Sequence, residues 1–493
     1  MELGELKVKS LNAVFWNLSG TLLKQGISFI ISLFLARLLT PADFGIVGMA
    51  TVFITFTQGF SDLGLSSALI QTKQPTQEQY SSVFFFNLFT SSLLALILWI
   101  SSGLIAQFYA NPSVKPIVQF ISYSFIINSL TSVQWSILYK NLDVKKTRLA
   151  NLFSSIIGGC AGIIMAFNGF GVWSMIYSGF IGSCISVIII WYYSGWRPSF
   201  HFSFSAIKGL FPFGFRVFLI NYMQEVYEKI DVLIIGRLFN PNTLGLYFRA
   251  TSFNQLITKY TSQSLSGVFF PLISNLQHDL EEIKRVFTKT LHTVCFLSFM
   301  LSGVLYVSAE PLIVILFTAK WYPAVHYFKI LVFSSYVLPM TLLFNGVLLG
   351  TGNARKQLRL EVWKKALGVL GILIGFLFGI NGYLWALALT STAGLMLSLY
   401  FIDTTINLNV KSSLRFIYVY AIPMFLGMLA SSFTNQFTSN LVLKLVLNSS
   451  CFLVCYLTVC YLFNIKGFHF TFRLIISFLT PHKKYFNQKL NYE

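Results

Sequence analysis

The chain has 493 residues, of which 55% are hydrophobic and 10% charged, and its formal net charge is +19. A soluble globular chain carries about 25% charged residues, and a mean hydropathy of +0.70 is far too apolar for one. These values exclude a soluble globular protein and indicate an integral membrane protein. Its apolar runs have the length of membrane-spanning helices, about 20 residues, rather than the short alternating pattern of an outer-membrane barrel.

Apolar runs of this length recur along most of the chain, and each predicts one membrane-spanning helix. The first run is of full helix length and follows a charged segment, Met1 to Lys9, so we expect no cleavable signal peptide. The fourteen predicted spans are residues 11–36, 44–66, 82–106, 116–138, 149–167, 171–193, 209–235, 243–268, 287–308, 326–350, 361–380, 383–402, 414–432 and 441–463.

The positive charge is distributed unevenly between the two sides of the predicted membrane. With a cytoplasmic N-terminus, 24 of the 35 Lys and Arg residues fall on the cytoplasmic side, six outside and five within helices. This asymmetry is the positive-inside rule, so the charge reports orientation and not a nucleic-acid site. We therefore expect a multi-pass protein of the cytoplasmic (inner) membrane with both termini cytoplasmic and no nucleic-acid partner.

One charged turn occurs twice in the sequence. The stretches "ARLLTPADFG" (36–45) and "GRLFNPNTLG" (236–245) belong to a match at a constant offset of 200, with nine identities across 24 aligned positions. A weaker similarity between residues 168–173 and 381–385 indicates a repeating unit of six helices. Because six is even, both copies enter the membrane in the same direction, which predicts two lobes related by a pseudo-twofold axis along the membrane normal. For the turn itself we favour a structural role over substrate binding: Arg reaches the interface, Pro begins the next helix and Gly closes the hairpin.

The repeat and the hydropathy pattern together predict the domain organisation. Two parallel six-helix lobes suit a transporter that works by alternating access. The predicted parts are an N-terminal lobe at 1–200, a C-terminal lobe at 201–405, two additional transmembrane helices at 406–465 and a basic amphipathic cytoplasmic tail at 466–493.

Polar side chains form helical stripes in the first two predicted spans. Asn17 and Lys24 share one face of span 11–36, and Gln58 and Asp62 share one face of span 44–66. A charged residue at the centre of a bilayer costs roughly 2.5 to 3.5 kcal/mol even on insertion scales. We therefore expect both stripes to face the bundle interior or a water-filled cavity.

The second half carries more buried charge, with an excess of cations over carboxylates in the spans at 209–235 and 243–268. This surplus favours an anion-binding role, with phosphate as the natural partner of Arg and Lys. Internal ion pairs, such as Glu225 with Lys229, are the structural alternative, and the carboxylates could instead exchange H⁺ or Na⁺. The candidate substrate-binding residues are Lys24, Arg216, Lys229, Arg249, Lys259, Asn17 and Gln58, and the candidate ion-coupling residues are Asp62, Glu225, Glu228 and Asp231.

Motifs of enzymes are missing from the sequence. It contains no P-loop, no HExxH and no GxSxG, and its six His and six Cys lack metal-binding spacing. We expect no catalytic residues, no metal and no cofactor. Without an ATP site, transport would draw on an ion gradient or on substrate flow.

The segments "LARLLTPADFGIVGMATVF" and "FSDLGLSSALIQ" in the first half, with "IDVLIIGRLF" in the second, resemble a known family. It is the bacterial polysaccharide transporters of the multidrug/oligosaccharidyl-lipid/polysaccharide exporter superfamily, in the branch of colanic acid and teichuronic acid exporters. The resemblance covers about the first 400 residues. It implies a flippase: a V-shaped pair of six-helix lobes that moves an undecaprenyl-pyrophosphate-linked oligosaccharide from the inner to the outer leaflet. Cations of the central cavity would meet the pyrophosphate and acidic sugars.

The expected partners are the lipid-linked oligosaccharide, membrane lipids and H⁺ or Na⁺ as a coupling ion, and we expect a monomer. Three alternatives stay open at this point. They are a cation-coupled multidrug exporter of the same superfamily, a membrane-embedded polysaccharide polymerase or ligase, and a non-transporting assembly scaffold.

Overall fold

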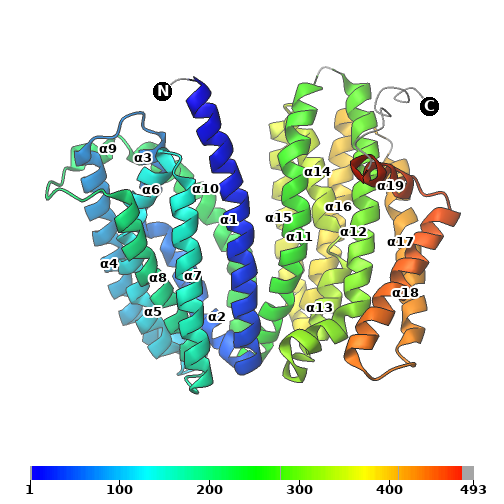
Figure 1. Ribbon diagram of the computed structural model, residues 1–493, viewed down its shortest axis with the longest axis horizontal. Helices are drawn as coiled ribbons and strands as arrows, with labels where there is room; N and C mark the ends of the chain where they lie inside the picture. The colour runs from blue at the N-terminus through cyan, green and yellow to red at the C-terminus, as the bar shows by residue number, and fades with distance from the viewer. Residues whose placement is uncertain (1–2, 278, 409, 480–493) are drawn as a thin grey trace. The chain divides into compact units, whose positions relative to one another are not determined.

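The structure is a computed structural model that describes residues 3–277, 279–408 and 410–479. Within these ranges it gives no side chains for residues 3–11, 14, 253–268, 410–413, 416, 474–475 and 477–479. The described residues form α-helices and short 3₁₀ turns joined by loops, with no β-strand among them (Figure 1). The predicted all-helical fold class is therefore confirmed.

The chain divides into two compact units, residues 1–248 and 249–493. Helix α10 packs against α2 and α3 and so belongs to the first unit. The predicted lobe boundary at residue 200, the pseudo-twofold and the other domain limits stay predictions. The first unit contains α1 (Leu3–Leu38), α2 (Pro41–Gln58), η1 (Gly59–Ser61), α3 (Leu65–Gln71), α4 (Gln77–Phe108), α5 (Val114–Ser129), α6 (Ser132–Lys140), α7 (Val144–Phe167), α8 (Val172–Ser194), α9 (Phe204–Lys208), α10 (Phe211–Leu238) and the start of α11 (Pro241–Asn275).

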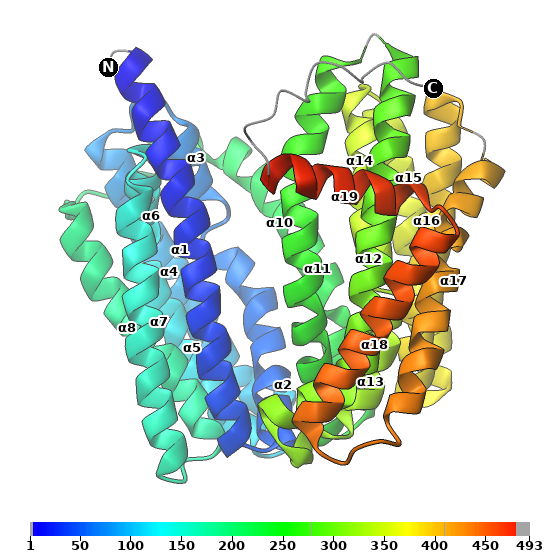
Figure 2. The ribbon, with the colours of Figure 1, turned by 45° about the vertical axis from the view of Figure 1, so that its right-hand side comes forward.

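The second unit is built around the long helix α12 and continues to the last described residue. Its core includes fully buried aromatic residues such as Phe344, Tyr420 and Phe452. Figure 2 shows α19 lying across α12 and not alongside it, where the sequence predicts a basic amphipathic segment. The remaining elements are α12 (Leu280–Phe317), η2 (Ala319–Trp321), α13 (Ala324–Phe333), α14 (Val337–Gly350), α15 (Ala354–Leu377), α16 (Gly379–Ile406), α17 (Val410–Thr434), α18 (Leu441–Leu462) and α19 (Lys466–Leu479).

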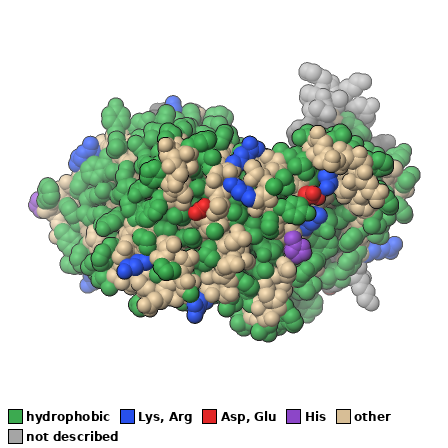
Figure 3. Space-filling view, turned by 90° about the horizontal axis from the view of Figure 1, so that it is seen from below, with side chains coloured by type: hydrophobic (Ala, Val, Ile, Leu, Met, Phe, Trp, Pro, Cys, Tyr) green, Lys and Arg blue, Asp and Glu red, His purple; other side chains and the backbone are tan. Residues whose placement is uncertain are grey.

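Eleven stretches among the described residues are long and apolar enough to cross a membrane. Three further long helices, α10, α11 and α15, lie where the sequence predicts spans but carry more charge. Figure 3 shows hydrophobic side chains over much of one face, with uncharged polar residues and backbone between them and only scattered charged side chains. The chain is a multi-pass membrane protein, and the number of fourteen spans stays a prediction.

The repeated turn begins two helices that touch each other. A Cβ atom on Gly45 would lie 1.8 Å from the backbone oxygen of Pro241, and one on Gly245 would lie 1.8 Å from that of Pro41. Phe248 packs on Gly48, the position 200 residues earlier. The contact is thus reciprocal, as expected near a local twofold axis. Any side chain larger than hydrogen at either glycine would push the two helices apart.

Three spans that the sequence predicts as continuous are broken in the structure. The span at 44–66 ends as α2 at Gln58 and restarts as α3, the span at 116–138 divides into α5 and α6, and the span at 326–350 divides into α13 and α14. At two of the breaks hydroxyl groups bond the preceding turn: Thr131 Oγ1 donates to the carbonyl of Asn128 at 2.9 Å, and Ser335 Oγ to that of Val332 at 2.8 Å. Such bonds compete with the helical ladder and bend helices. Apolar periodicity does not reveal them.

Candidate functional site

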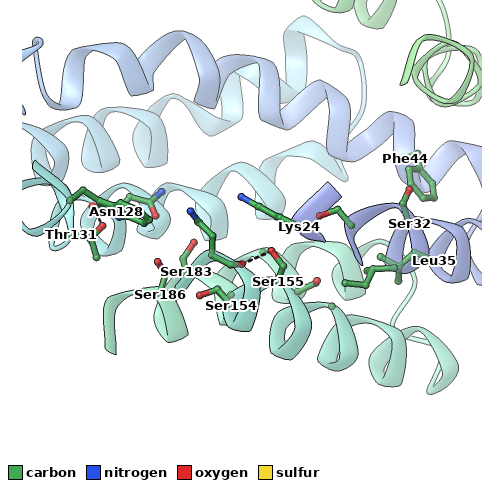
Figure 4. Close-up of a pocket in the computed structure, with 18 residues that line it drawn as sticks. Lys24, Ser32, Leu35, Phe44, Asn128, Thr131, Ser154, Ser155, Ser183 and Ser186 are labelled. Atoms are coloured by element: carbon green, nitrogen blue, oxygen red, sulfur yellow. Dashed lines mark hydrogen bonds between the residues drawn. The ribbon is translucent and has the colours of Figure 1, made fainter. Parts of the chain in front are cut away.

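The first unit contains a polar cavity of about 500 Å³. Lys24 extends into it from α1, opposite hydroxyl groups of α7 and α8 (Figure 4). Lys24 is the one cationic side chain among its lining residues, no carboxylate lines it, and Lys24 forms no ion pair with the described residues. The polar lining residues are Lys24, Ser28, Ser32, Asn128, Thr131, Asn151, Ser154, Ser155, Ser178, Ser183 and Ser186.

Small residues allow this wall to form. A Cβ atom on Gly158 of α7 would lie 2.5 Å from the carbonyl oxygen of Ser178 on α8, so these two helices pack backbone to backbone. Beside this contact, Ser155 Oγ donates to Asn151 O at 2.8 Å, whereas Ser154 Oγ is buried without a hydrogen-bond partner in the described structure. Close packing with serine side chains thus gives a hydroxyl-rich surface inside an apolar bundle.

A second cation, Arg148 of α7, lies beside Lys24. Its side chain packs over Gly20, where a Cβ atom would come within 2.7 Å of the Arg148 Cβ. Arg148 Nη2 donates a hydrogen bond to Asn17 Oδ1. Two neighbouring cations beside a hydroxyl-lined cavity without a carboxylate form a surface suited to an anion or a sugar.

A second cavity of about 360 Å³ adjoins the first, and the two share Asn128 and Trp135 in their walls. Gln58 and Asp62 line the second cavity, together with hydroxyl groups from α3 and from the break between α5 and α6. The two polar stripes predicted for the first spans therefore lead to two cavities, with Lys24 in one and Asp62 in the other.

The candidate residues of α10 line neither cavity. Arg216, Glu225 and Glu228 are exposed in the first unit, and Lys229 is half-buried. Glu225 and Lys229 form no ion pair within the described part of the chain, although their spacing allows one. Since lipid would penalise an exposed charged helix face, this face of α10 must meet water or protein.

Three other candidates have different surroundings. Asp231 accepts a hydrogen bond from the hydroxyl of Tyr247 and another from the backbone of Val232, which is 2.7 Å away. Arg249 is 7% exposed, and its guanidinium lies 4.5 Å from the ring centre of Phe317 and 5.0 Å from that of Trp321. The side chain of Lys259 lies outside the described residues.

The sequence did not point to Arg148, which lies beside the first cavity, or to several residues that line the two cavities. Arg148 was counted with the cytoplasmic charges, although Arg148, Asn151 and Ser155 follow helical spacing and share one face of α7. Asn128 and Thr131 lie in the run "INSLTS", whose polar residues mark the helix break. Both signals are in the sequence, but apolar run length hides them.

The apolar helices and the polar cavities among them define the class of protein: a multi-pass helical membrane protein with polar cavities inside its bundle. The same fold is seen in the lipid II flippase MurJ in an inward closed conformation, with a TM-score of 0.72 and 15% identity over 94% of this chain and 100% of that one. An inward-facing multidrug resistance transporter of the MATE family has a TM-score of 0.59 and 13% identity over 78% of this chain and 98% of that one. At these identities the likeness shows the fold alone.

A family described as "polysaccharide biosynthesis protein" matches residues 34–326. The match covers more than half of the chain, and the chain belongs to this family.

Similar proteins include the succinoglycan biosynthesis transport protein ExoT of Rhizobium meliloti, 25% identical over 66% of this chain and 66% of its own length. The teichuronic acid biosynthesis protein TuaB of Bacillus subtilis is 25% identical over 82% of this chain and 85% of its own. The lipopolysaccharide biosynthesis protein WzxC of Escherichia coli is 20% identical over 75% of this chain and 76% of its own length.

Proposed function

We propose that this protein is a flippase that moves an undecaprenyl-pyrophosphate-linked oligosaccharide from the inner to the outer leaflet of the cytoplasmic membrane. The family, the transporter named among its relatives and the fold all support this class. The protein would export repeat units for a cell-surface polysaccharide. It is a transporter in this proposal and not an enzyme.

One observation carries the proposal: a hydroxyl-rich cavity with Lys24 in its wall, Arg148 beside it and no carboxylate in its lining. Hydroxyl and amide groups exchange hydrogen bonds with sugars, and the two cations attract pyrophosphate or an acidic sugar. A volume of about 500 Å³ is within the usual range for a small-ligand site. We propose that Lys24, Asn17 and Gln58 contribute the N-terminal part of the substrate site.

The cations of the second half would complete the substrate site. We propose that Arg216, Lys229, Arg249 and Lys259 contact the anionic head group during alternating access between two lobes, while the prenyl tail stays in lipid. The protein would work as a monomer with both termini in the cytoplasm, driven by H⁺ or Na⁺. The uneven distribution of Lys and Arg supports this orientation.

A multidrug exporter for cationic drugs is the rival within the superfamily. It would need a carboxylate facing its ligand, and none lines the Lys24 cavity. A polymerase or ligase would need catalytic residues on a sizeable outer loop. The described loops between candidate spans are short, which leaves the polymerase or ligase without a supporting observation. The multidrug exporter would have to use Asp62 of the adjoining cavity.

The test is a flipping assay in proteoliposomes with an undecaprenyl-pyrophosphate-linked acidic oligosaccharide. Loss of one charge-assisted contact weakens binding by about 1.5 to 3 kcal/mol, or roughly tenfold to hundredfold. We expect the Lys24→Gln and Arg148→Gln variants to lower the initial rate of flipping at subsaturating substrate by such factors. Lys24→Arg, which keeps the charge, should retain most of the rate.

The matched control is Lys145→Gln. Lys145 is exposed on the same helix as Arg148, and its ammonium lies 5.0 Å from the ring centre of Trp16, whereas Arg148 bonds Asn17. Size-exclusion profiles must show that all variants fold. Equal rates for wild type and a folded Lys24→Gln, Arg148→Gln double variant would remove the anion-binding cavity from the mechanism.

A further inference from the structure

Asp62 lies at a break between two helices. Helix α2 ends at Gln58, η1 covers Gly59–Ser61, and Leu63 and Gly64 follow with φ angles of 45° and 75°, in the left-handed region. Gly64 is required here for a second reason, because a Cβ atom would lie 2.0 Å from the carbonyl oxygen of Gly214 on α10. The break is therefore fixed by packing. In transporters, broken helices are common sites for bound cations.

The Asp62 carboxylate has neutral partners within the described structure. Ser66 Oγ and Asn87 Nδ2 each donate to Asp62 Oδ1 at 2.6 Å, and the Ser66 backbone N lies 3.1 Å from Oδ1 and 3.2 Å from Oδ2. No Lys, Arg or His lines the adjoining cavity, and no described residue forms an ion pair with Asp62. A carboxylate in such surroundings lacks a countercharge, which is costly away from bulk water.

Asn87 gives an independent sign of a ligand. The residue is 1% exposed and lines the same cavity as Asp62. Its Nδ2 bonds Asp62 and lies 3.0 Å from Ser132 Oγ, whereas its Oδ1 is buried and accepts no hydrogen bond. A half-turn of the amide would bring Oδ1 beside Asp62 and Ser132. Three oxygen atoms would then face a common point, which is an arrangement that favours a cation.

We infer that Asp62, Asn87 and Ser132 form a Na⁺ site within the first unit, and this inference deepens the proposed function by naming its coupling ion. Without an ion, Ser66 and Asn87 donate to the Asp62 carboxylate and hold its oxygen atoms at the helix break. Oxygen ligands suit hard cations, and a single carboxylate among neutral groups suits a monovalent one. Lys140, the basic residue of α6, donates to backbone carbonyls of Leu69, Ile70 and Thr72.

The other candidate carboxylates have no comparable surroundings. Glu225 and Glu228 are exposed on α10, where Gln224 Nε2 donates to Glu228 at 3.0 Å. Asp231 accepts from the Tyr247 hydroxyl. None of the three lines the Asp62 cavity.

The Na⁺ site would act on the substrate through a shared wall. Asn128 and Trp135 line both the Asp62 cavity and the Lys24 cavity. A Na⁺ ion at Asp62 would add positive charge next to the chamber that holds the anionic group, and it would draw the Asn87 amide into a new orientation. Binding of the ion and of the anion would then favour each other.

The test uses the purified full-length protein in detergent without substrate. The melting temperature is measured against NaCl concentration, with choline chloride keeping the ionic strength constant and KCl in place of NaCl as the comparison. We expect a saturable rise with Na⁺ that K⁺ does not reproduce. Asp62→Asn should abolish the rise, and Asn87→Leu, similar in size, should lower the apparent Na⁺ affinity roughly 10- to 100-fold.

Glu225→Gln is the matched control and should keep the full Na⁺ response, and each variant must melt cooperatively without Na⁺. Equal responses to Na⁺ and K⁺, or a full Na⁺ response in Asp62→Asn, would overturn the site. Because substrate is absent, such a result leaves the proposed transport function standing. A failed flipping assay with an intact Na⁺ response would instead reject the proposed transport function and leave the Na⁺ site standing.

Discussion

Two glycines explain at the level of single residues why the chain repeats one charged turn. Gly45 and Gly245 each lie against the backbone of the other copy's proline, where an added Cβ atom would come within 1.8 Å of the carbonyl oxygen. Backbone atoms cannot move aside as the end of a flexible side chain can. The repeated Gly therefore serves helix contact from inside α2 and α11, and does not close the hairpin as the sequence interpretation had it.

We expect Gly45→Ala and Gly245→Ala to destabilise the protein. Overpacking of a tight contact costs about 1 to 3 kcal/mol, and here the clash is with backbone, so the cost should lie at the upper end. The measurement is the melting temperature of the purified protein. Gly103→Ala is the control, since Gly103 lies in helix α4 with nothing within 4 Å of its Cβ position, and it should melt at or above the wild-type temperature. Equal melting of all three variants would contradict the proposed contact.

The sequence pattern predicted some residues of the candidate site and missed others. Lys24 and Gln58 stand on polar stripes with helical spacing, and each lines a cavity in the structure. Arg148 was missed because it lies at the end of its span, where a basic residue is expected in any membrane protein. Its contact with Asn17 joins α7 to α1, 131 positions earlier in the chain. A long-range pairing of this kind leaves no trace in local spacing.

At the level of elements, the sequence predicts where helices lie but not where they break. Long apolar runs identify most of the helices, since any membrane-spanning helix must satisfy its own backbone. The break between α5 and α6 falls inside one such run, at Leu130 and Thr131. It depends on hydroxyl groups that bond the preceding turn and on tertiary packing. This break lines both cavities, so the missed feature is also a functional one.

One buried hydroxyl group, that of Tyr420, makes a specific polar contact between α19 and the rest of the second unit. Tyr420 is fully buried, its Oη accepts from the backbone N–H of Gly467 at 3.0 Å, and it lies 2.9 Å from His292 Nδ1. A Cβ atom on Gly467 would lie 2.4 Å from the carbonyl oxygen of His292, so only glycine fits this crossing. The amphipathic helix is thus held in place by a specific polar contact as well as by its apolar face.

We expect Tyr420→Phe to loosen α19 without unfolding the unit. Loss of the hydroxyl leaves a buried N–H and a ring nitrogen without this partner, at a cost of about 1 to 3 kcal/mol. Amide hydrogen exchange over residues 466–473 should become roughly tenfold faster or more. Tyr418→Phe is the control, because Tyr418 lies on the same helix and is 54% exposed. Unchanged exchange in Tyr420→Phe would show that the apolar face alone holds α19.

At the level of the whole molecule, the two halves share more than the repeated turn. The fourth predicted span of each half is broken, as α5 and α6 in one and as α13 and α14 in the other. Serine or threonine hydroxyls bond the preceding turn at both breaks. The sequence carries these residues, yet the identities at offset 200 do not extend to them. The two breaks fall at the same place in the predicted six-helix unit, and the unit itself stays a prediction.

The orientation of the chain follows from charge placement over its whole length. With 24 of 35 Lys and Arg residues on one predicted side, and about 1 kcal/mol favouring each basic residue near an anionic cytoplasmic leaflet, we expect both termini in the cytoplasm. Green fluorescent protein fused after Glu493 should fluoresce, because it folds in the cytoplasm, and alkaline phosphatase fused there should be inactive. Alkaline phosphatase fused after Phe437, in the loop between α17 and α18, should be active, because that loop lies outside in a fourteen-span topology. Activity of both phosphatase fusions, or of neither, would mean that an odd number of crossings must be added or removed between Phe437 and Glu493. The positive-inside assignment, on which the proposed direction of transport depends, would then be wrong.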